Sequence, residues 1–448
     1  MKALISVSDK TGIVKFAREL ESHGYEIIST GGTYKILKEN GIKAISIENV
    51  TDFPEMLDGR VKTLHPKIHG GLLSLRDNKN HMKTCKDHKI NLIDMVVVNL
   101  YPFEKTISKN TVTLEEAIEN IDIGGPSMIR SGAKNYKSVS VVVNPERYKE
   151  VEEELKKGKG KISQKFRSKL ACEAFTHTAN YDAIISEYLT NQMSESEAEE
   201  CPTIITAKLE KITDLRYGEN PHQQAAFYKF SGHNGLTGIK QLHGKQLSYN
   251  NIVDLEAAAL IVKEFDIPGA VIIKHTNPCG AAISDSISDA YYKAYNSDPV
   301  SAFGSIVGLN RGVDKKAAEE IAKTFVEAVI APSFDEDALQ ILTKKPSIRL
   351  IALEGLQKLG KGYYYKYIDG GFLVQTSDTV KVGEKDLQVV TKQNITQKQL
   401  NDLLFAFTLV KYVKSNAILV AKEGQVLGVG AGQMSRIEAV EIALKKAG

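Results

Sequence analysis

The segment VIIKHTNPCG, residues 271–280, places a lysine and a histidine side by side where an apolar run ends. Neighbouring residues of an extended strand point to opposite faces, but Asn277 and Pro278 predict a bend that brings Lys274 and His275 into one cleft. A cation beside an imidazole disfavours its protonated form, which leaves the imidazole ready to accept a proton at pH 7. The lysine would stabilise developing negative charge. The pair therefore indicates proton-transfer catalysis; the alternative is an exposed lysine beside a histidine bonded to backbone.

The first half of the chain contains a second set of candidate groups. RVKTLHPKIHGG, residues 60–71, shows little helical or strand period. Its cations suit a phosphorylated substrate, although a solvated basic loop would have the same composition. They are Arg60, Lys62, His65, Lys67 and His69. Farther on, Asp122 precedes a glycine pair and Lys134 lies on the helix predicted after it, so these two residues with Lys62 and Tyr101 could transfer protons.

Two short turns are candidates for binding phosphate. SVSDKTG (6–12) and STGGT (29–33) each lie between a predicted strand and a predicted helix. Free backbone N–H groups and the helix dipole favour an anion at such a position. Ser, Asp and Thr also cap helices without any ligand, so capping is the alternative for each turn taken singly.

These groups need a scaffold, which the hydrophobic pattern predicts. Residues 2–50 alternate short apolar runs with helical spacing, and residues 92–103 and 138–144 supply two more buried strands. The pattern predicts an α/β domain with a parallel sheet, whose ligands bind beyond the carboxyl ends of the strands. The polar residues at those ends are Ser6, Ser8, Thr30, Asn99 and Tyr101.

A chain of 448 residues is too long for one ordinary core. We expect an α/β domain over 1–145, a helical connector and linker over 146–200, and a second α/β unit over 201–448. A net charge of +3 gives no general reason to expect nucleic acid or a membrane as partner. The four cysteines form neither a C-x-x-C metal motif nor a dense disulfide framework, and no long apolar run is present. We therefore expect a cytoplasmic protein without a catalytic metal.

Nine motifs in order carry a resemblance to a known family. They are SVSDKTG, STGGT, GRVKTLHPKIHGG, NLYPF, IDIGG, LRYGENPHQ, KHTNPCG, KSNAILVAK and GAGQMSR. The chain resembles the bifunctional purine-biosynthesis family with AICAR transformylase and IMP cyclohydrolase activities. The resemblance implies formyl transfer from 10-formyltetrahydrofolate to AICAR, then closure of FAICAR to IMP with loss of water. It also implies homodimers, with transformylase sites that include residues of both subunits.

The resemblance implies a methylglyoxal-synthase-like N-terminal domain that carries the cyclohydrolase. Its implied catalytic residues are Lys62, Tyr101, Asp122 and Lys134, with acid and base roles unassigned. Its implied substrate contacts are Ser8, Lys10, Thr33, Thr63, His65, Asn99 and Gly124.

For the C-terminal unit the resemblance implies a cytidine-deaminase-like α/β transformylase without catalytic zinc. His275 would take the proton of the AICAR amine, and Lys274 and Asn416 would stabilise the oxyanion and the proton shuttling. The implied substrate contacts are Arg216, Tyr217, Asn251, Gly304, Glu327 and Arg436.

One departure from the family's pattern leaves an alternative open. Members of the family continue past the GAGQMSR helix, whereas this sequence ends at Gly448, so we expect a transformylase domain without the family's C-terminal segment. The alternative function is cyclohydrolase activity alone, with a weakened transformylase and a C-terminal unit that serves as a dimerisation scaffold. A regulatory nucleotide-binding module without turnover is the third possibility.

Overall fold

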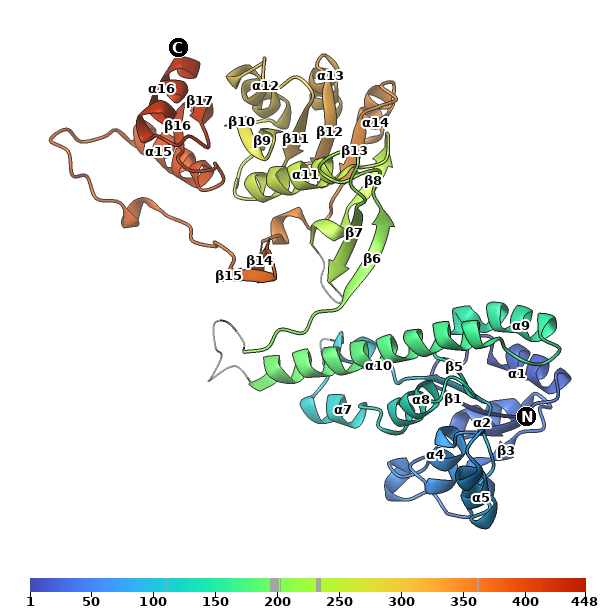
Figure 1. Ribbon diagram of the computed structural model, residues 1–448. Helices are drawn as coiled ribbons and strands as arrows, with labels where there is room; N and C mark the ends of the chain where they lie inside the picture. The colour runs from blue at the N-terminus through green and yellow to red at the C-terminus, as the bar shows by residue number, and fades with distance from the viewer. Residues whose placement is uncertain (110, 194–200, 202, 231–234, 361) are drawn as a thin grey trace. The chain divides into compact units, whose positions relative to one another are not determined.

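The structure is a computed structural model and describes residues 1–109, 111–193, 201, 203–230, 235–360 and 362–448 (Figure 1). The chain divides into two compact units, Met1–Lys208 and Leu209–Gly448. Each unit is an α/β structure with its own sheet and its own hydrophobic core.

The first unit is built on a parallel five-stranded sheet with the order β3-β2-β1-β4-β5. Its strands are β1 (Lys2–Val7), β2 (Glu26–Ser29), β3 (Ile45–Ser46), β4 (Met95–Asn99) and β5 (Ser140–Val142). The parallel sheet predicted from the hydrophobic pattern is confirmed. The strand order reverses between β1 and β4, which is the position where open α/β sheets bind ligands.

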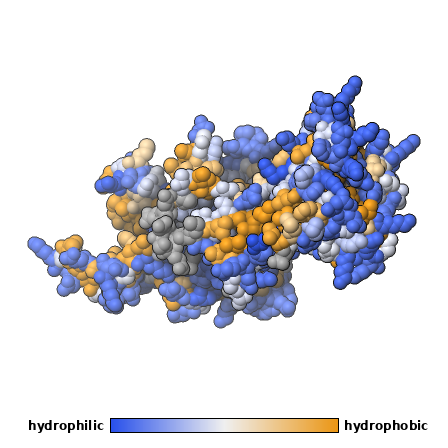
Figure 2. All heavy atoms as spheres, turned by 90° about the horizontal axis from the view of Figure 1, so that it is seen from below, coloured by the Kyte–Doolittle hydropathy of each residue, from blue (hydrophilic) through white to orange (hydrophobic). Residues whose placement is uncertain are grey.

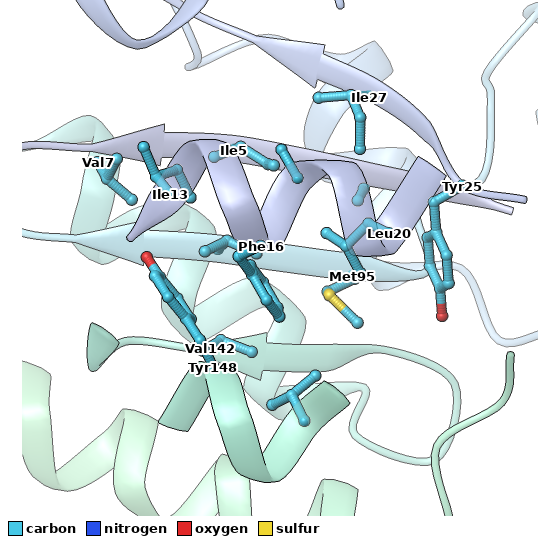
Figure 3. Close-up of a cluster of buried hydrophobic side chains, with 14 of the residues drawn as sticks. Ile5, Val7, Ile13, Phe16, Leu20, Tyr25, Ile27, Met95, Val142 and Tyr148 are labelled. Atoms are coloured by element: carbon cyan, nitrogen blue, oxygen red, sulfur yellow. The ribbon is translucent and has the colours of Figure 1, made fainter. Parts of the chain in front are cut away.

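Helices cover both faces of this sheet. They are α1 (Ile13–Ser22), α2 (Gly31–Glu39), α3 (Ile47–Thr51), α4 (Pro66–Leu73), α5 (Lys79–Asp87), α6 (Phe103–Ile107), α7 (Leu114–Glu119), α8 (Gly124–Lys134), α9 (Tyr148–Lys157) and α10 (Gln164–Met193). In the cluster of Figure 3, the rings of Phe16 and Tyr148 stack with centroids 4.3 Å apart. Tyr148, Val151 and Leu155 of α9 are all buried in the same core. Residues 146–193, which we expected to form a connector, are therefore packed as part of this unit, while 194–200 lie outside the described residues.

The prediction that residues 60–71 lack regular structure is wrong for the second half of the segment. Pro66 is the first residue of α4, a position that proline tolerates because its missing N–H has no helical partner there. His65 is the N-cap, and its Nδ1 accepts a hydrogen bond of 3.1 Å from the N–H of Lys67. The helix buries Ile68 and Leu72, which are four residues apart.

The second unit contains a mixed eight-stranded sheet with the order β16-β17-β10-β9-β11-β12-β13-β8. Its strands are β8 (Lys240–His243), β9 (Gly269–Lys274), β10 (Asn277–Ile283), β11 (Ser305–Leu309), β12 (Val326–Ala331), β13 (Arg349–Ala352), β16 (Ile418–Lys422) and β17 (Gln425–Gly430). Two hairpins, β6 (Leu209–Asp214) with β7 (Ala226–Phe230) and β14 (Tyr363–Ile368) with β15 (Gly371–Thr376), pair separately. Its helices are α11 (Tyr249–Val262), α12 (Ile287–Ser297), α13 (Lys315–Ala322), α14 (Glu336–Leu342), α15 (Gln397–Val410) and α16 (Arg436–Ala447).

The two faces of this sheet have separate cores. Residues of α11 and α15 pack on one face, and residues of α12, α13 and α14 pack on the other. Apolar side chains also reach the surface among hydrophilic ones (Figure 2), and Tyr367 and Phe372 of the β14–β15 hairpin are 68% and 62% exposed. Among the helices described here, none combines the length and the apolar character that crossing a membrane requires.

Candidate active sites

Asn99 organises the first site, at the switch point between β1 and β4. Its Oδ1 accepts hydrogen bonds from the backbone N–H groups of Ser8 at 2.6 Å and Asp9 at 2.8 Å. Its Nδ2 donates to the carbonyl of Asp9 at 2.9 Å. The side chain therefore ties the turn after β1 to the end of β4, and it fixes the position of the first predicted phosphate turn.

The second phosphate turn is joined to the same strand end through Thr33. The buried Thr33 hydroxyl accepts from the N–H of Val7 at 3.1 Å and donates to its carbonyl at 3.0 Å. The N-cap residues of α1 and α2, Gly12 and Thr30, make no side-chain capping bond. The backbone N–H groups that begin these helices are thus not occupied by their own caps, which favours the anion site over the capping alternative.

Two lysines approach these helix starts. The Lys10 ammonium donates to the carbonyl of Ser8 at 3.2 Å. A Cβ placed on Gly31 would lie 3.3 Å from Nζ of Lys62, so the missing side chain lets Lys62 come close to the first turn of α2. Lys62 is also paired with the carboxylate of Glu55, a partner that the sequence analysis missed.

Asp122 lies in the loop before α8 and is fixed from both sides. Its Oδ1 accepts the N–H of Gly125 at 2.8 Å, and its own N–H donates to the hydroxyl of Tyr181 at 2.8 Å. Burial raises the pKa of the Asp122 carboxyl, while the N–H groups of Gly125 and Tyr101 lower it. A carboxyl that binds a proton more readily than usual is suited to acid–base work.

The phenol of Tyr101 lies within electrostatic reach of both this carboxyl and the ammonium of Lys62. Partial burial and the charge of Asp122 raise the pKa of the Tyr101 phenol, whereas the charge of Lys62 lowers it. The hydroxyl of Thr63 reaches the start of α8, where a Cβ on Gly124 would lie 2.5 Å from it. An ammonium, a phenol and a carboxyl are therefore gathered around one strand edge.

The structure separates other predicted residues from this cluster. Lys134 is exposed at the far end of α8, about 15 Å from Gly124 along the helix axis. His69 bonds to the hydroxyl of Ser131 at 2.9 Å, and burial lowers its pKa, which disfavours the charged form that a phosphate-binding cation needs. Lys67 and Arg60 are paired with carboxylates, those of Asp52 and Glu119.

The second site is built on the hairpin of β9 and β10. Lys274 pairs with Asn277 across a turn made of His275 and Thr276, whose φ angles are 51° and 64°. The prediction that Asn277 and Pro278 form the bend is wrong, because both residues already belong to β10. A type I′ two-residue hairpin needs positive φ at both central residues, and here these are the two residues that follow the lysine.

The Lys274 side chain and the backbone of the turn have defined contacts, while His275 is exposed. The Lys274 ammonium donates to the carbonyls of Phe303 at 2.8 Å and Gly304 at 3.0 Å. The N–H of Thr276 donates to Oδ1 of Asp254 at 2.7 Å, and the charge of His275 lowers the pKa of that carboxyl against the raising effect of burial. Asp254 was not predicted; the sequence signal is that Asp254 and Glu256 are the two carboxylates in the otherwise apolar segment IVDLEAAALIV.

Asn416 lies in a segment that is tied to the same hairpin. The N–H of Lys414 donates to Oδ1 of Asn277 at 3.2 Å, and Nδ2 of Asn277 donates to the carbonyl of His275 at 3.0 Å. The Asn416 amide donates to the carbonyls of Gln433 at 3.0 Å and Met434 at 3.2 Å. The amide oxygen of this side chain can accept a hydrogen bond.

A third group gathers the predicted nucleotide contacts. Nδ2 of Asn251 donates to Oε2 of Glu327 at 3.1 Å, and the same oxygen lies 3.8 Å from Nη1 of the buried Arg349. The guanidinium of Arg216 lies over the ring of Tyr217, 4.9 Å from its centroid. Burial lowers the pKa of Arg349, and the charge of Glu327 raises it. The positive charge of Arg216 lowers it again, because the two guanidinium groups repel one another. Arg349 was not predicted either; its signal is a charge inside the apolar strand RLIA.

Arg436 is the first residue of α16 and is exposed. Within the described part of the chain, no group of three His, Cys, Asp or Glu side chains is placed to hold a metal ion.

Comparison with known proteins identifies both halves of the chain. Residues 132–446 match the model of a family described as the AICARFT/IMPCHase bienzyme, and residues 12–127 match an MGS-like domain. A protein of Thermoanaerobacter sp. (strain X514) is 55% identical over 450 residues, which are 100% of this chain and 87% of the relative. A protein of Acetivibrio thermocellus is 55% identical and one of Bacillus cytotoxicus 51% identical, with the same coverage. All three relatives carry the name bifunctional purine biosynthesis protein PurH.

Proposed function

The chain belongs to the AICARFT/IMPCHase bienzyme family, and from that premise we propose that it catalyses two consecutive steps of purine biosynthesis. The first step transfers a formyl group from a folate co-substrate, 10-formyltetrahydrofolate, to the amine of AICAR and gives FAICAR. The second step closes FAICAR to IMP with release of water. The observation that carries this proposal is the presence of two separate clusters of acid–base groups, one in each unit.

The cluster of the first unit fits the ring closure. The carboxamide nitrogen of FAICAR attacks the formyl carbon and loses one proton, and the formamide N–H loses a second proton as the new ring C=N bond forms. The former formyl oxygen takes up both protons, its bond to carbon breaks, and it leaves as water. Lys62, Tyr101 and Asp122 supply the acid and the base that these transfers need. The starts of α1 and α2, with Lys10, would hold the 5′-phosphate.

We leave Lys134 out of this catalytic set. Its side chain is exposed at the opposite end of α8 from Gly124, farther than its own length can span. We give His65 no direct contact through Nδ1, since that nitrogen caps α4.

The cluster of the second unit fits the formyl transfer. The amine of AICAR attacks the formyl carbon and a tetrahedral oxyanion forms, while the attacking nitrogen gives its proton to His275. The oxyanion then collapses, the bond between the formyl carbon and N10 of the folate breaks, and N10 takes up the proton as tetrahydrofolate leaves. Lys274 uses two of its three N–H groups on the carbonyls of Phe303 and Gly304, so one remains for the oxyanion. The groups around Arg216 and Glu327 would bind the nucleotide.

The chain also carries features that support a homodimer. Aromatic side chains of the β14–β15 hairpin are strongly exposed, Tyr367 and Phe372 among them, and a second copy of the chain would bury them. A cytoplasmic location remains a prediction from the sequence.

Separate assays of the two steps test the proposal. The chain is given AICAR and 10-formyltetrahydrofolate while tetrahydrofolate formation is followed, and FAICAR is supplied in a second assay of cyclisation. His275→Ala should abolish transfer and spare cyclisation, and Asp122→Ala should do the reverse. Cyclisation without formyl transfer would support the alternative function, which is cyclohydrolase activity alone. Tight binding of AICAR or IMP with neither conversion would indicate the regulatory module.

A further inference from the structure

Thr276, which follows His275 in the turn, has two unfavourable features. Thr276 adopts a φ of 64°, and a left-handed backbone is strained for a β-branched side chain. Among the described residues, its buried Oγ1 also has no hydrogen-bond partner. Strain of this kind persists only where the surrounding structure enforces it. A specific contact must therefore hold the turn.

Asp254 of α11 supplies that contact. Its Oδ1 accepts the N–H of Thr276 at 2.7 Å, and the N–H of His275 is directed at the same carboxyl, whose pKa it lowers. A partly buried carboxylate needs such donors, so the two groups satisfy one another. The α11 helix is itself fixed, because it packs with Val271 and Ile273 of β9 in one core.

The charges around the carboxyl agree with this arrangement. Burial raises the pKa of Asp254, and the N–H of Thr276 and the charges of His275 and Lys274 lower it. Asp254 lies 22 residues before Thr276, and the helix and the hairpin bring them together.

We propose that Asp254 is a positioning residue for formyl transfer, whose carboxylate holds the His275–Thr276 turn in its left-handed form and thereby aims the imidazole of His275. This inference rests on the proposed function of the second unit. Asp254 acts on the backbone of the turn and not on the substrate.

The test compares Asp254→Ala and Asp254→Asn in the full chain. In the alanine variant kcat for formyl transfer should fall about 100-fold, the usual result when a catalytic group is misplaced by an ångström, with KM for AICAR changed less than about 3-fold. The asparagine variant keeps an oxygen acceptor and should retain clearly more activity. Cyclisation of FAICAR should be unchanged in both. Glu256→Gln, on the same helix, is the matched control and should transfer formyl groups at the unmodified rate.

A second substitution separates positioning from general destabilisation. Asparagine adopts the left-handed conformation more readily than threonine, so Thr276→Asn should restore part of the kcat that Asp254→Ala loses. Unchanged transfer in Asp254→Ala would overturn the proposal. A loss that is equal in the alanine and asparagine variants, and that Thr276→Asn does not relieve, would also overturn it.

Amide hydrogen exchange keeps this inference distinct from the proposed function. If the unmodified chain transfers no formyl group, the proposed function fails. The exchange of the turn's N–H groups still shows whether Asp254 holds the turn. The N–H groups of His275 and Thr276 should exchange faster in Asp254→Ala than in the unmodified chain. Equal exchange rates in Asp254→Ala and the unmodified chain would show that Asp254 does not hold the turn.

Discussion

Tyr181 shows how a single buried side chain can fix a candidate catalytic residue from outside the site. Its hydroxyl accepts the N–H of Asp122 and donates to the carbonyl of Asn120 at 3.3 Å. Burial raises the pKa of this phenol to about 12, so it stays protonated at neutral pH. Its ring packs at the edge of Phe103 with centroids 6.3 Å apart. The residue thus joins α10 to the loop that carries Asp122.

We expect Tyr181→Phe to reduce cyclisation of FAICAR by about 10-fold or more. The change keeps the packing on Phe103 but leaves the N–H of Asp122 without its acceptor, which costs about 1–3 kcal/mol. Steady-state cyclisation rates measure the effect, and formyl transfer should not change. Tyr188→Phe is the matched control, since Tyr188 packs on the same Phe103 ring from the same helix. Equal rates in both variants would contradict the role of the hydroxyl.

The raised pKa of Asp122 has a consequence for stability. In the folded protein the carboxyl binds a proton more readily than at its usual pKa of 3.8, so its favourable contribution is complete below that pH and is lost as the pH rises through the folded-state pKa. At pH 7 the charged form therefore opposes folding. Asp122→Asn should raise the midpoint of thermal unfolding at pH 7 by roughly 2–4 °C, the shift that 1 kcal/mol produces in a domain of this size.

Thermal unfolding from pH 7 down to pH 4 checks this expectation. The advantage of Asp122→Asn should shrink as the pH falls, because the unmodified carboxyl then becomes neutral as well. A constant difference across this range would mean that burial of the charge is not its cause. Asp122→Asn should also lose FAICAR cyclisation, because substitutions that remove a destabilising charge from an active site usually lower activity.

At the scale of elements, close contact between a strand and a helix shapes the second site. Gly428 and Gly430 lie two residues apart and so face the same side of β17. A Cβ on these glycines would lie 2.1 and 2.0 Å from the carbonyl oxygens of Ala443 and Ala439 in α16. The helix therefore lies directly on the strand, and Gln433, whose carbonyl holds Asn416, is in the segment that connects them.

Gly430→Ala should force α16 away from β17 and destabilise the second unit by about 1–3 kcal/mol, the usual cost of overpacking. We expect formyl transfer to fall with it, while cyclisation persists. Denaturant unfolding with both assays measures the separation. Gly355→Ala is the control, because a Cβ at Gly355 meets nothing within 4 Å and should change stability by less than about 0.5 kcal/mol. Equal loss in the two variants would refute the role of the close contact.

At the scale of the whole molecule, the two units bury separate hydrophobic cores. The buried residues of the first unit's clusters run from Ala3 to Tyr181, and those of the second unit's clusters run from Leu247 to Val429. No buried cluster among the described residues mixes the two. Each unit also holds its own cluster of candidate catalytic groups.

Residues 1–208 produced alone should therefore fold and cyclise FAICAR at about the rate of the full chain. The reason is that the Lys62, Tyr101 and Asp122 cluster, with its support from Tyr181, lies entirely within this range. Circular dichroism, thermal unfolding and the cyclisation assay check the fragment. A fragment that folds cooperatively but does not cyclise FAICAR would show that the site needs residues from elsewhere.

The sequence by itself determined the fold class, the parallel sheet of the first unit and the two candidate sites. These features depend on local patterns, because a hydrophobic period, a glycine turn or a short motif can each be read from about ten consecutive residues. Family membership was predictable for the same reason, because ordered motifs need no knowledge of contacts. The α4 helix and the position of the bend at His275 were missed although they are local, because a histidine cap and a threonine in a left-handed turn are uncommon choices.

Only the tertiary structure decided which side chains meet. Asn251 and Glu327 are 76 residues apart, and Tyr181 and Asp122 are 59 apart, yet each pair shares a hydrogen bond. Lys134, by contrast, is only twelve residues from Asp122 and lies at the other end of α8. Strand order and helix packing set these distances, and a local pattern carries no information about a partner on another element. The partners of Asp254, Arg349 and Tyr181 therefore became visible only when the chain was folded.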